Sequence, residues 1–169
     1  MSFLELCRQR RSIRNYTAQP VEKQRVEQIL QAALMAPSAK RLQPWQFVVV
    51  DDKAMIEQLA ACKQYGSHML LEAPLAIVVA ADASLTDTWQ CDAAIAAHNM
   101  LLAAEDLGLG ACWVHVYERE QAEEHVRALT GIPDNLNVLC IVSIGYKNEQ
   151  RRTYELDKLP YEKIHYGKF

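Results

Sequence analysis

Four arginines and a serine lie close together near the start of the chain. Arg8, Arg10, Arg11 and Arg14 fall within seven residues, and Ser12 stands among them. Guanidinium groups bind phosphate through paired hydrogen bonds and a serine hydroxyl adds another, so the cluster is suited to one phosphate dianion. The alternative is a solvated helix end whose cations pair with surface acids or interact favourably with the helix dipole. Clusters of charged residues are more often solvent-exposed surface of this kind than binding sites.

A loop between two regular segments carries a second group of hydrogen-bond donors. The loop begins where Pro37 ends a helical pattern, and it leads into a strand at Trp45. Its donors are Ser38, Lys40, Arg41 and Gln43. The loop is longer than a connector requires, and functional residues are concentrated on loops. Two interpretations stay open, a binding loop or a long connector anchored by the tryptophan.

Two further signals are weaker. In the segment GLGACW, residues 108–113, the glycines allow a sharp turn and a close approach of bare backbone to a ligand. A plain helix cap is the simpler explanation of such a glycine pair. Arg151 and Arg152 form another basic spot, of a kind that is more often surface than site.

The chain lacks the usual signatures of catalysis by side chains alone. It has no GxGxxG or GxxxxGKS phosphate loop and no serine in a nucleophile elbow, and its five histidines are scattered. His98 lies in an apolar helical pattern, so we interpret it as a hydrogen-bonded core or interface residue. Any chemistry would therefore have to be supplied by a cofactor.

Composition limits the class of protein. The 169 residues are 50% hydrophobic with a net charge of -3, which suits one domain over residues 1–169 and disfavours a general nucleic-acid binder. The five cysteines are far apart and suggest neither a disulfide framework nor a zinc site. The first residues do not resemble a signal peptide, and no apolar run is long enough to span a bilayer. We therefore expect a cytoplasmic protein that does not bind membranes.

Helical and strand patterns alternate along the chain. Helices are expected from Ser2 to the arginine cluster, from Pro20 to the stop at Pro37, and over residues 51–62, 88–107 and 118–129. Strands are expected over residues 45–50, 75–81, 112–117 and 138–145. These elements have to position the basic cluster, the donor loop and the glycine segment relative to one another.

The expected helix over residues 88–107 is apolar on nearly all sides. Between Ala93 and Ala104 only His98 and Asn99 interrupt the apolar run, so more than one neighbour has to cover this helix. In a chain of this size the second neighbour is expected to be another copy, which predicts a homodimer. The polar and aromatic tail over residues 146–169 shows little periodicity and is expected to dock on the partner subunit.

Taken in order, the segments RRSIRNY, APSAKRLQPWQFVVV, GLGACWV and VSIGY resemble the flavin-dependent nitroreductase family. The resemblance covers almost the whole chain, and its first two motifs are the specific ones. It implies an α+β fold, a three-layer α/β/α sandwich with a central, mostly antiparallel sheet, built as an intertwined homodimer. It also implies FMN as the cofactor, bound at the subunit interface so that each site draws on both chains.

The resemblance assigns roles to four segments of this chain. It places Arg10, Arg11, Ser12 and Arg14 on the phosphate, the ribityl chain and the pyrimidine edge of the flavin. Pro37, Ser38, Ala39 and Arg41 match the loop that the other subunit lays over the flavin ring. The segment Ala111, Cys112, Trp113 and Val114 passes near the ring with its backbone groups, and either Arg151 or Arg152 reaches the phosphate.

One position departs from the usual pattern of the family. Arg41 stands where many members carry an asparagine in the motif APSxxNxQPW. A guanidinium cannot accept a hydrogen bond as an amide can, so a contact with the flavin N3 proton would be lost or replaced. If Arg41 points at the ring, its charge favours the anionic reduced flavin, and if it points outward, it is available to an acidic substrate or reductant.

The function implied by the resemblance is that of an FMN-dependent oxidoreductase. Such an enzyme takes hydride from NADH or NADPH at flavin N5 and passes it, in a ping-pong sequence, to a nitroaromatic, a quinone or a similar small-molecule acceptor. Other interpretations stay open from the sequence. They are a flavin-binding sensor or storage protein, a specialised flavin dehalogenase or dehydrogenase, and a protein without flavin whose arginines dock an acidic partner.

Overall fold

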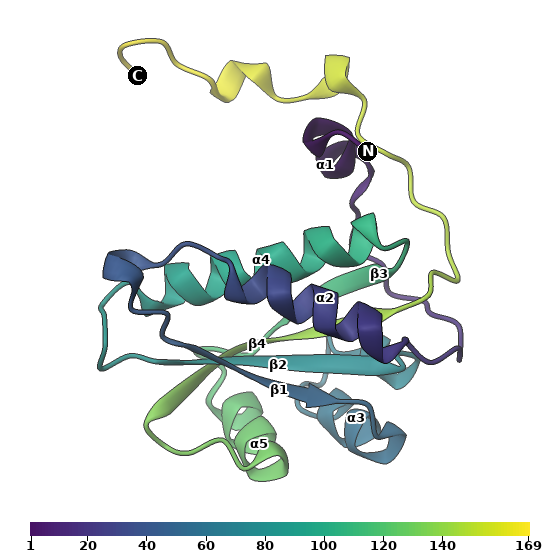
Figure 1. Ribbon diagram of the computed structural model, residues 1–169, viewed down its shortest axis with the longest axis vertical. Coiled ribbons are helices and arrows are strands. Elements are labelled where there is room, and N and C mark those ends of the chain that lie inside the picture. Colours follow the sequence, from purple (N-terminus) through teal and green to yellow (C-terminus); the bar gives the residue numbers. More distant parts are fainter.

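The computed structural model describes all residues, 1–169, and arranges them in three layers with a sheet in the middle (Figure 1). The helices are α1 (Phe3–Gln9), α2 (Lys23–Leu34), α3 (Lys53–Ala60), α4 (Trp89–Asp106) and α5 (Glu120–Thr130). The strands are β1 (Trp45–Val50), β2 (Leu75–Asp82), β3 (Gly110–His115) and β4 (Leu136–Gly145). Short 3₁₀ turns occur at Ala39–Arg41, His68–Leu71, Leu156–Lys158 and Tyr161–Lys163. This is the α+β, three-layer architecture that the sequence led us to expect.

The sheet has the strand order β1-β2-β4-β3, and all its neighbouring pairs are antiparallel. The two central strands are β2 and β4, and nearly every residue in them is buried. They are continuous apolar runs because helices cover both faces of the sheet. The expectation of a mostly antiparallel central sheet is confirmed.

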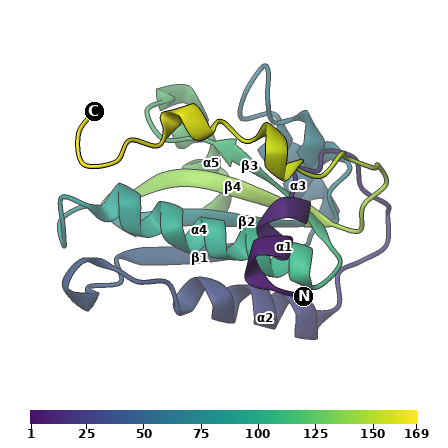
Figure 2. The same ribbon diagram turned by 90° about the horizontal axis from the view of Figure 1, so that it is seen from above.

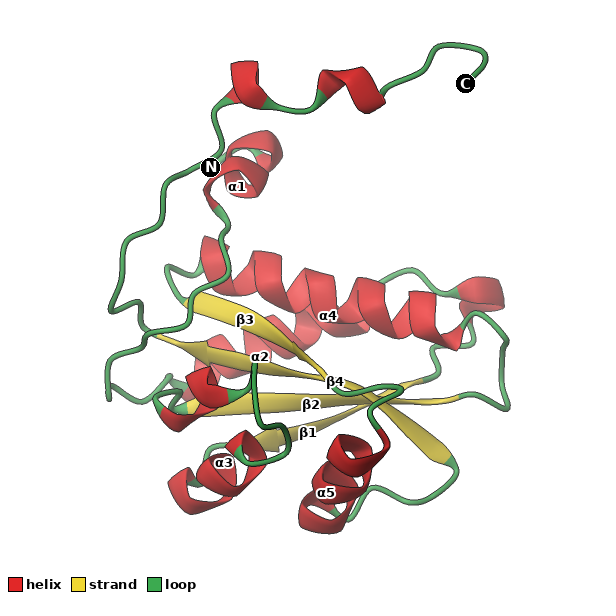
Figure 3. Cartoon of the chain, turned by 180° about the vertical axis from the view of Figure 1, so that it is seen from behind, coloured by secondary structure: helices red, strands yellow, loops and turns green.

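The two faces of the sheet make two separate cores. Figure 3 shows α2 and α4 on one face and α3 and α5 on the other. Side chains alternate along β2, so that Ile77 and Val79 pack under α2 and α4, while Ala76 and Val78 pack against α3 and α5. Both layers of helix are therefore held by hydrophobic burial against the same central strand.

Helix α4 is buried on more than one side, as its composition indicated. Ala93, Ala97 and Met100 are fully buried, and the Asn99 amide donates a 2.9 Å hydrogen bond to the Ala32 carbonyl at the end of α2. One stripe of α4 faces outward, where Ile95 is 40% exposed. No helix combines the length and apolar composition needed to cross a membrane.

Some element boundaries differ from the sequence expectation. The third strand is Gly110–His115 rather than residues 112–117, because the chain turns at residues 116–119, where Glu118 has a φ of +58°. The following helix consequently begins at Glu120. Helix α2 begins at Lys23 rather than near Pro20, because the preceding residues stay extended, with the Thr17 amide bonded to the Tyr146 carbonyl at 2.9 Å.

Residues 10–16 form an extended segment, here called the N-terminal strap, which lies along the end of the sheet. The Ile13 amide donates to the Ala111 carbonyl on β3 at 3.1 Å. The buried Tyr16 hydroxyl donates to the Ile13 carbonyl at 2.6 Å and lies 2.8 Å from the Ser143 hydroxyl on β4. The strap is therefore fastened to both β3 and β4 by polar contacts within the core.

Glu149, which follows β4, fastens the other side of the strap. Its carboxylate accepts hydrogen bonds from the amides of Arg14 (2.5 Å) and Asn15 (3.3 Å), and it pairs with the Arg151 guanidinium at 2.7 Å. Burial acts to raise the pKa of Glu149, but these backbone hydrogen bonds and Arg151 outweigh it, so the pKa is lowered overall. The ionised carboxylate is the form that holds the strap.

Beyond Glu149 the chain leaves the body of the protein. Residues 150–169 run past α1 and away from the three layers, and nearly all of them are exposed (Figures 1 and 2). Near its start this tail is tied to α1 by a hydrogen bond from the Tyr154 amide to the Arg8 carbonyl, at 3.1 Å. The tail does not cover the core of its own chain, and its docking on a partner subunit stays a prediction.

We expect Tyr16→Phe to lower the free energy of unfolding by about 1–2 kcal/mol, because it removes a buried donor and leaves the Ile13 carbonyl without its partner. Urea unfolding would measure the change. Tyr146→Phe is the matched control, since the Tyr146 hydroxyl bonds the exposed Glu22 carboxylate and its loss should cost less than about 0.5 kcal/mol. Equal losses in the two variants would contradict a buried role for the strap contact.

We expect Glu149→Gln to be less stable than the wild type at neutral pH and to approach it in acid. A pKa that is lower in the folded state than in the unfolded state stabilises the fold above the unfolded value, and this contribution is lost as the pH falls through the folded value. Thermal unfolding of both proteins from pH 7 to pH 3 would show the difference shrinking. A difference that is independent of pH would exclude the ionised carboxylate as the fastening group.

Candidate functional site

The strap brings two of the segments singled out in the sequence side by side. Ser12 forms an isolated parallel bridge with Ala111, at the start of β3. This approach requires the absence of a side chain at Gly110, where a Cβ atom would lie 2.7 Å from the Ile13 Cβ. The second glycine of GLGACW therefore admits the strap, while the first, Gly108, closes α4 with a φ of +76°.

Arg151 joins the strap as a third segment of the site. Its guanidinium pairs with the Glu149 carboxylate, which also accepts a hydrogen bond from the Arg14 backbone amide. Glu149 therefore links Arg151 to the strap. Arg152 is exposed and forms no ion pair. Of these two C-terminal arginines, Arg151 is the one that the fold attaches beside the strap.

The four arginines near the N-terminus have different surroundings. Arg8 forms a 2.8 Å ion pair with Glu5 on α1. The Arg11 guanidinium lies 4.3 Å from the centre of the Tyr154 ring, in a cation-π contact with the tail. Arg10 and Arg14 have no acidic partner within ion-pairing distance. These two cations are therefore the ones available to an anionic ligand, with the Ser12 hydroxyl between them in sequence.

The positive charge of the strap affects the pKa values of two nearby groups, Cys112 and His98. Burial raises the pKa of the Cys112 thiol, and Arg14, Ser12 and Arg10 partly oppose that change. Burial and the charge of Arg10 both lower the pKa of His98, which is exposed on the outward stripe of α4. The charge of Arg10 on the strap therefore extends to this part of α4.

The segment 111–114 offers backbone rather than side chains. Ala111, Cys112 and Val114 are buried in the two cores, and Trp113 is half-buried, with its ring stacked near His115 at 6.4 Å. None of these side chains is placed as an acid or a base. A ligand lying against this strand would meet peptide groups and an apolar wall.

The donor loop lies elsewhere in the same chain. Figures 1 and 2 place it beside the N-terminal end of α4, whereas the strap and α1 lie toward the C-terminal end of that helix. Helix α4 has 18 residues, and such a helix is about 27 Å long. Pro37, Ser38, Ala39 and Arg41 are therefore not brought together with Arg10 and Arg14 within one chain.

Residues 38–43, here called the 38–43 turn, have an unusual backbone. Lys40, Arg41 and Gln43 have positive φ values of 50°, 58° and 47°. Each such conformation costs a residue other than glycine about 1–2 kcal/mol. Strain of this kind persists only where the surroundings fix the backbone, so the contacts of the turn are informative.

Two side chains fix the 38–43 turn. The Ser38 hydroxyl accepts a 3.0 Å hydrogen bond from the Gln43 amide, which closes the turn on itself. The Asp92 carboxylate, in the first turns of α4, accepts a 3.1 Å hydrogen bond from the Ala39 amide. Pro44 and Trp45 are buried directly after the turn and anchor its far end.

Asp92 was not among the residues predicted from the sequence. It is only 4% exposed, and its second carboxylate oxygen has no hydrogen-bond partner. The positive end of the α4 dipole compensates part of the cost of burying this charge. A lone acid at the start of an apolar helix was the available signal, and the sequence alone did not show that it faces the turn.

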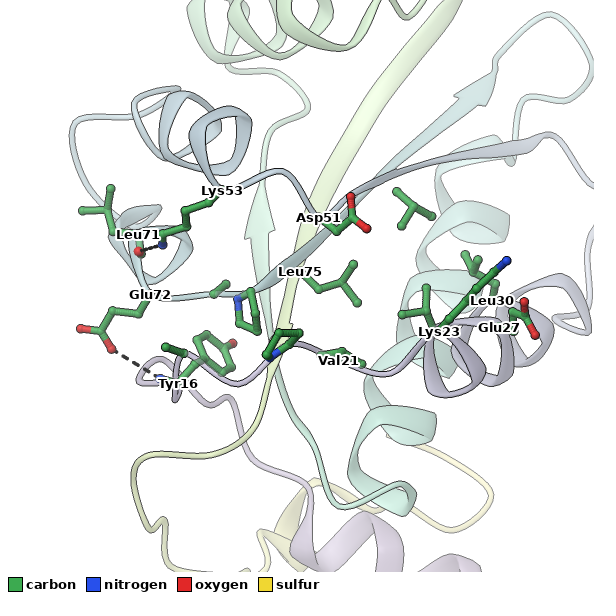
Figure 4. A pocket seen from close by; sticks show the side chains of 16 residues that line it. Tyr16, Val21, Lys23, Glu27, Leu30, Asp51, Lys53, Leu71, Glu72 and Leu75 are labelled. Atoms are coloured by element: carbon green, nitrogen blue, oxygen red, sulfur yellow. Dashed lines mark hydrogen bonds between the residues drawn. The ribbon is translucent and has the colours of Figure 1, made fainter.

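A pocket of about 900 Å³ lies at a different place, between the end of the strap, α2 and the end of β1 (Figure 4). Apolar side chains such as Val21, Leu30 and Leu75 line it, with charges of both signs at the rim. Figure 4 shows the Lys53 ammonium reaching the Leu71 carbonyl and the Glu72 carboxylate reaching the Tyr16 amide. No residue predicted for the site lines this pocket.

The donor set at the strap fits a phosphate-bearing cofactor such as FMN. Arg10 and Arg14 are unpaired cations, and Ser12 supplies a hydroxyl. Arg151 is attached to the strap through Glu149, with which it forms an ion pair. No group of three potential ligands from His, Cys, Asp or Glu is placed to hold a metal ion. The arrangement can therefore bind an anion next to a wall of peptide groups.

Comparison with known proteins gives a consistent result. Residues 7–146 match the model of the nitroreductase family. The chain is 42% identical, over 91% of its length and 90% of the relative's, to an Archaeoglobus fulgidus protein named as a candidate NADH dehydrogenase/NAD(P)H nitroreductase. It is 30% identical to an NADH dehydrogenase of Thermus thermophilus, with 92% of this chain and 90% of that one covered.

Comparison with solved structures agrees with the sequence comparison. The FMN-dependent nitroreductase of Clostridium difficile superposes with a TM-score of 0.96 at 42% identity, covering 99% of this chain and 100% of that one. The strap, the glycine segment and the 38–43 turn all fall inside the residues that match the family model. The chain therefore belongs to the nitroreductase family.

Proposed function

We propose that the protein is an FMN-dependent oxidoreductase that uses NADH or NADPH to reduce a nitroaromatic, a quinone or a similar electron-poor acceptor. The observation that carries the proposal is the pairing of the strap with β3, which sets two unpaired arginines beside segment 111–114, where backbone and apolar groups prevail. Its relatives include an NADPH-flavin oxidoreductase of Vibrio harveyi, 31% identical over 82% of this chain and 63% of that one.

The phosphate end of the cofactor is assigned to the strap. Arg10 and Arg14 would bind the phosphate and the pyrimidine edge, and the Ser12 hydroxyl would bind beside them. Arg151 would approach the phosphate from the side of Glu149, the acid with which it forms an ion pair. Arg11 is held by Tyr154 and is assigned a supporting role in which it fixes the tail against α1.

The ring end of the cofactor is assigned to segment 111–114. The bound flavin supplies hydride acceptance and donation at N5. The backbone of this segment would orient the ring, because its Cys112 and Val114 side chains are buried in the core. With no acid or base at the site, the proton is taken from water, so that a nitroaromatic, NAD(P)H and a proton give the nitroso compound, NAD(P)⁺ and water.

The turn that completes the site is assigned to the other subunit. Within one chain it lies at the far end of α4 from the strap. In a dimer, a second copy would bring its own turn to that strap. Apolar side chains on α1 and the tail, such as Phe3 (71% exposed) and Tyr166 (92% exposed), are left in water by a single chain. We propose a homodimer in which the tail docks on the partner subunit. The nicotinamide and the acceptor would bind one after the other at the same position over the flavin.

All five cysteines are unpaired, which suits a reducing compartment. We therefore also propose that this dimer works in the cytoplasm.

The first test is the absorption spectrum of the purified protein with FMN, before and after anaerobic addition of NADH or NADPH. We expect a flavin band that bleaches with at least one nicotinamide and returns when a quinone is added, because bound flavin is reduced and then reoxidised. A bound flavin that neither nicotinamide reduces would favour a flavin-binding sensor or store. A chain that takes up no FMN would contradict both proposals.

A mixed dimer tests whether each site uses two chains. Arg10→Ala damages the strap, and Ser38→Trp blocks the turn. If strap and turn come from different chains, a dimer with one variant of each kind keeps one intact site, so we expect about one FMN per dimer. Co-expression with two different affinity tags allows this dimer to be isolated, and each variant alone, which should bind little FMN, is the control. No flavin in the mixed dimer would place strap and turn in the same site of one chain.

A further inference from the structure

We propose that the 38–43 turn selects substrates that carry a carboxylate or a phosphate, and that Lys40 and Arg41 are the residues that bind this anionic group. The inference rests on the proposed function, because it requires that the turn reach the place where nicotinamide and acceptor bind. It adds to that function a substrate class, namely planar electron acceptors or nicotinamides with a small anionic group.

Lys40 and Arg41 have no partner in their own chain. Both are exposed, and neither forms an ion pair or a side-chain hydrogen bond. Some other cations of the chain, such as Arg8 and Arg127, lie within 3.1 Å of an acid on their own helix. The chain has 21 acidic residues against 18 basic ones, yet none of the acids accompanies these two cations.

The backbone of the turn holds the two cations in place. Lys40 and Arg41 are consecutive and both have positive φ, a conformation that glycine adopts without strain and that long side chains normally avoid. The Ser38 hydroxyl and the buried Asp92 carboxylate fix the turn on either side of them, by hydrogen bonds to Gln43 and Ala39. Two long basic side chains therefore emerge from a fixed turn rather than from a mobile loop.

A fixed pair of unpaired cations gives a predictable form of selectivity. A charged hydrogen bond to a carboxylate or phosphate strengthens binding of the anionic substrate, while a neutral analogue of the same shape gains nothing. The effect requires little reorganisation, because the turn is already ordered. We expect each cation to change the preference for the anionic substrate about three- to ten-fold at low ionic strength.

Two pairs of probes distinguish the possible sources of the anion. 4-Nitrobenzoate and 4-nitrobenzamide differ in charge at the end of the ring away from the nitro group, and NADPH differs from NADH by one phosphate. The ratio of kcat/KM within each pair is measured for the wild type, Lys40→Gln and Arg41→Gln. Comparing ratios between variants cancels the different reactivities of the two ring compounds, and glutamine removes the charge while keeping an unbranched polar side chain on the turn.

We expect at least one of the two ratios to fall about three- to ten-fold in Arg41→Gln or Lys40→Gln, and the wild-type ratio to fall as salt is added. The pair that responds identifies the acceptor or the reductant as the carrier of the anion. Arg119→Gln, an exposed cation next to α5 on the other face of the sheet, is the control and should leave both ratios unchanged.

Unchanged ratios in both variants, with normal turnover of the neutral substrates, would overturn the inference and leave the proposed function intact. An equal fall in the Arg119→Gln control would also overturn it, because the effect would then come from the net charge of the protein. A wild type that turns over neither member of either pair, while still binding FMN, would instead contradict the proposed function.

Discussion

The contact between the N-terminal strap and β3 is the constraint on which the rest of the site depends. A segment with four arginines near it would have no defined position if it were free in solvent. The Ile13 amide ties it to Ala111, and the missing side chain at Gly110 permits that approach. The buried Tyr16 hydroxyl and the Glu149 carboxylate then fix the strap from two other directions. As a result Arg10 and Arg14 extend from a backbone that is fixed beside β3, rather than from a segment that moves freely in solvent.

Helix α4 sets the distance between the two halves of the site. One end of this apolar helix lies toward the strap, while the other end carries Asp92 and holds the 38–43 turn. Because a helix of this length is rigid, the turn cannot fold back onto the strap of its own chain. The same helix leaves an outward stripe around Ile95 uncovered. Both properties support the proposed homodimer, and both follow from the length and composition of one element.

The elements themselves were largely predictable from the sequence, because each carries a strong local pattern. The continuous apolar runs of β2 and β4, and the apolar helix closed by Gly108, were found close to their observed positions. The errors lie where tertiary contacts override local preference. Pro20 is a common first residue of a helix, yet the chain there remains extended because the Thr17 amide is bonded to Tyr146. The turn after β3, with Glu118 at positive φ, likewise shortened one strand and delayed the next helix.

The chemical groups of the site and the family could be read from the order of the residues alone. The arginines, the serine, the donor loop and the glycine segment are recognised by residue type and order, which do not depend on the fold. Only the tertiary structure decided which of these groups are available. It placed Arg11 against Tyr154, left Arg10 and Arg14 unpaired, attached Arg151 rather than Arg152 to the strap, and buried Asp92 beneath the turn. Most of these choices depend on contacts between residues far apart in the chain, such as Arg14 and Glu149, which are 135 positions apart, and no local pattern encodes such contacts.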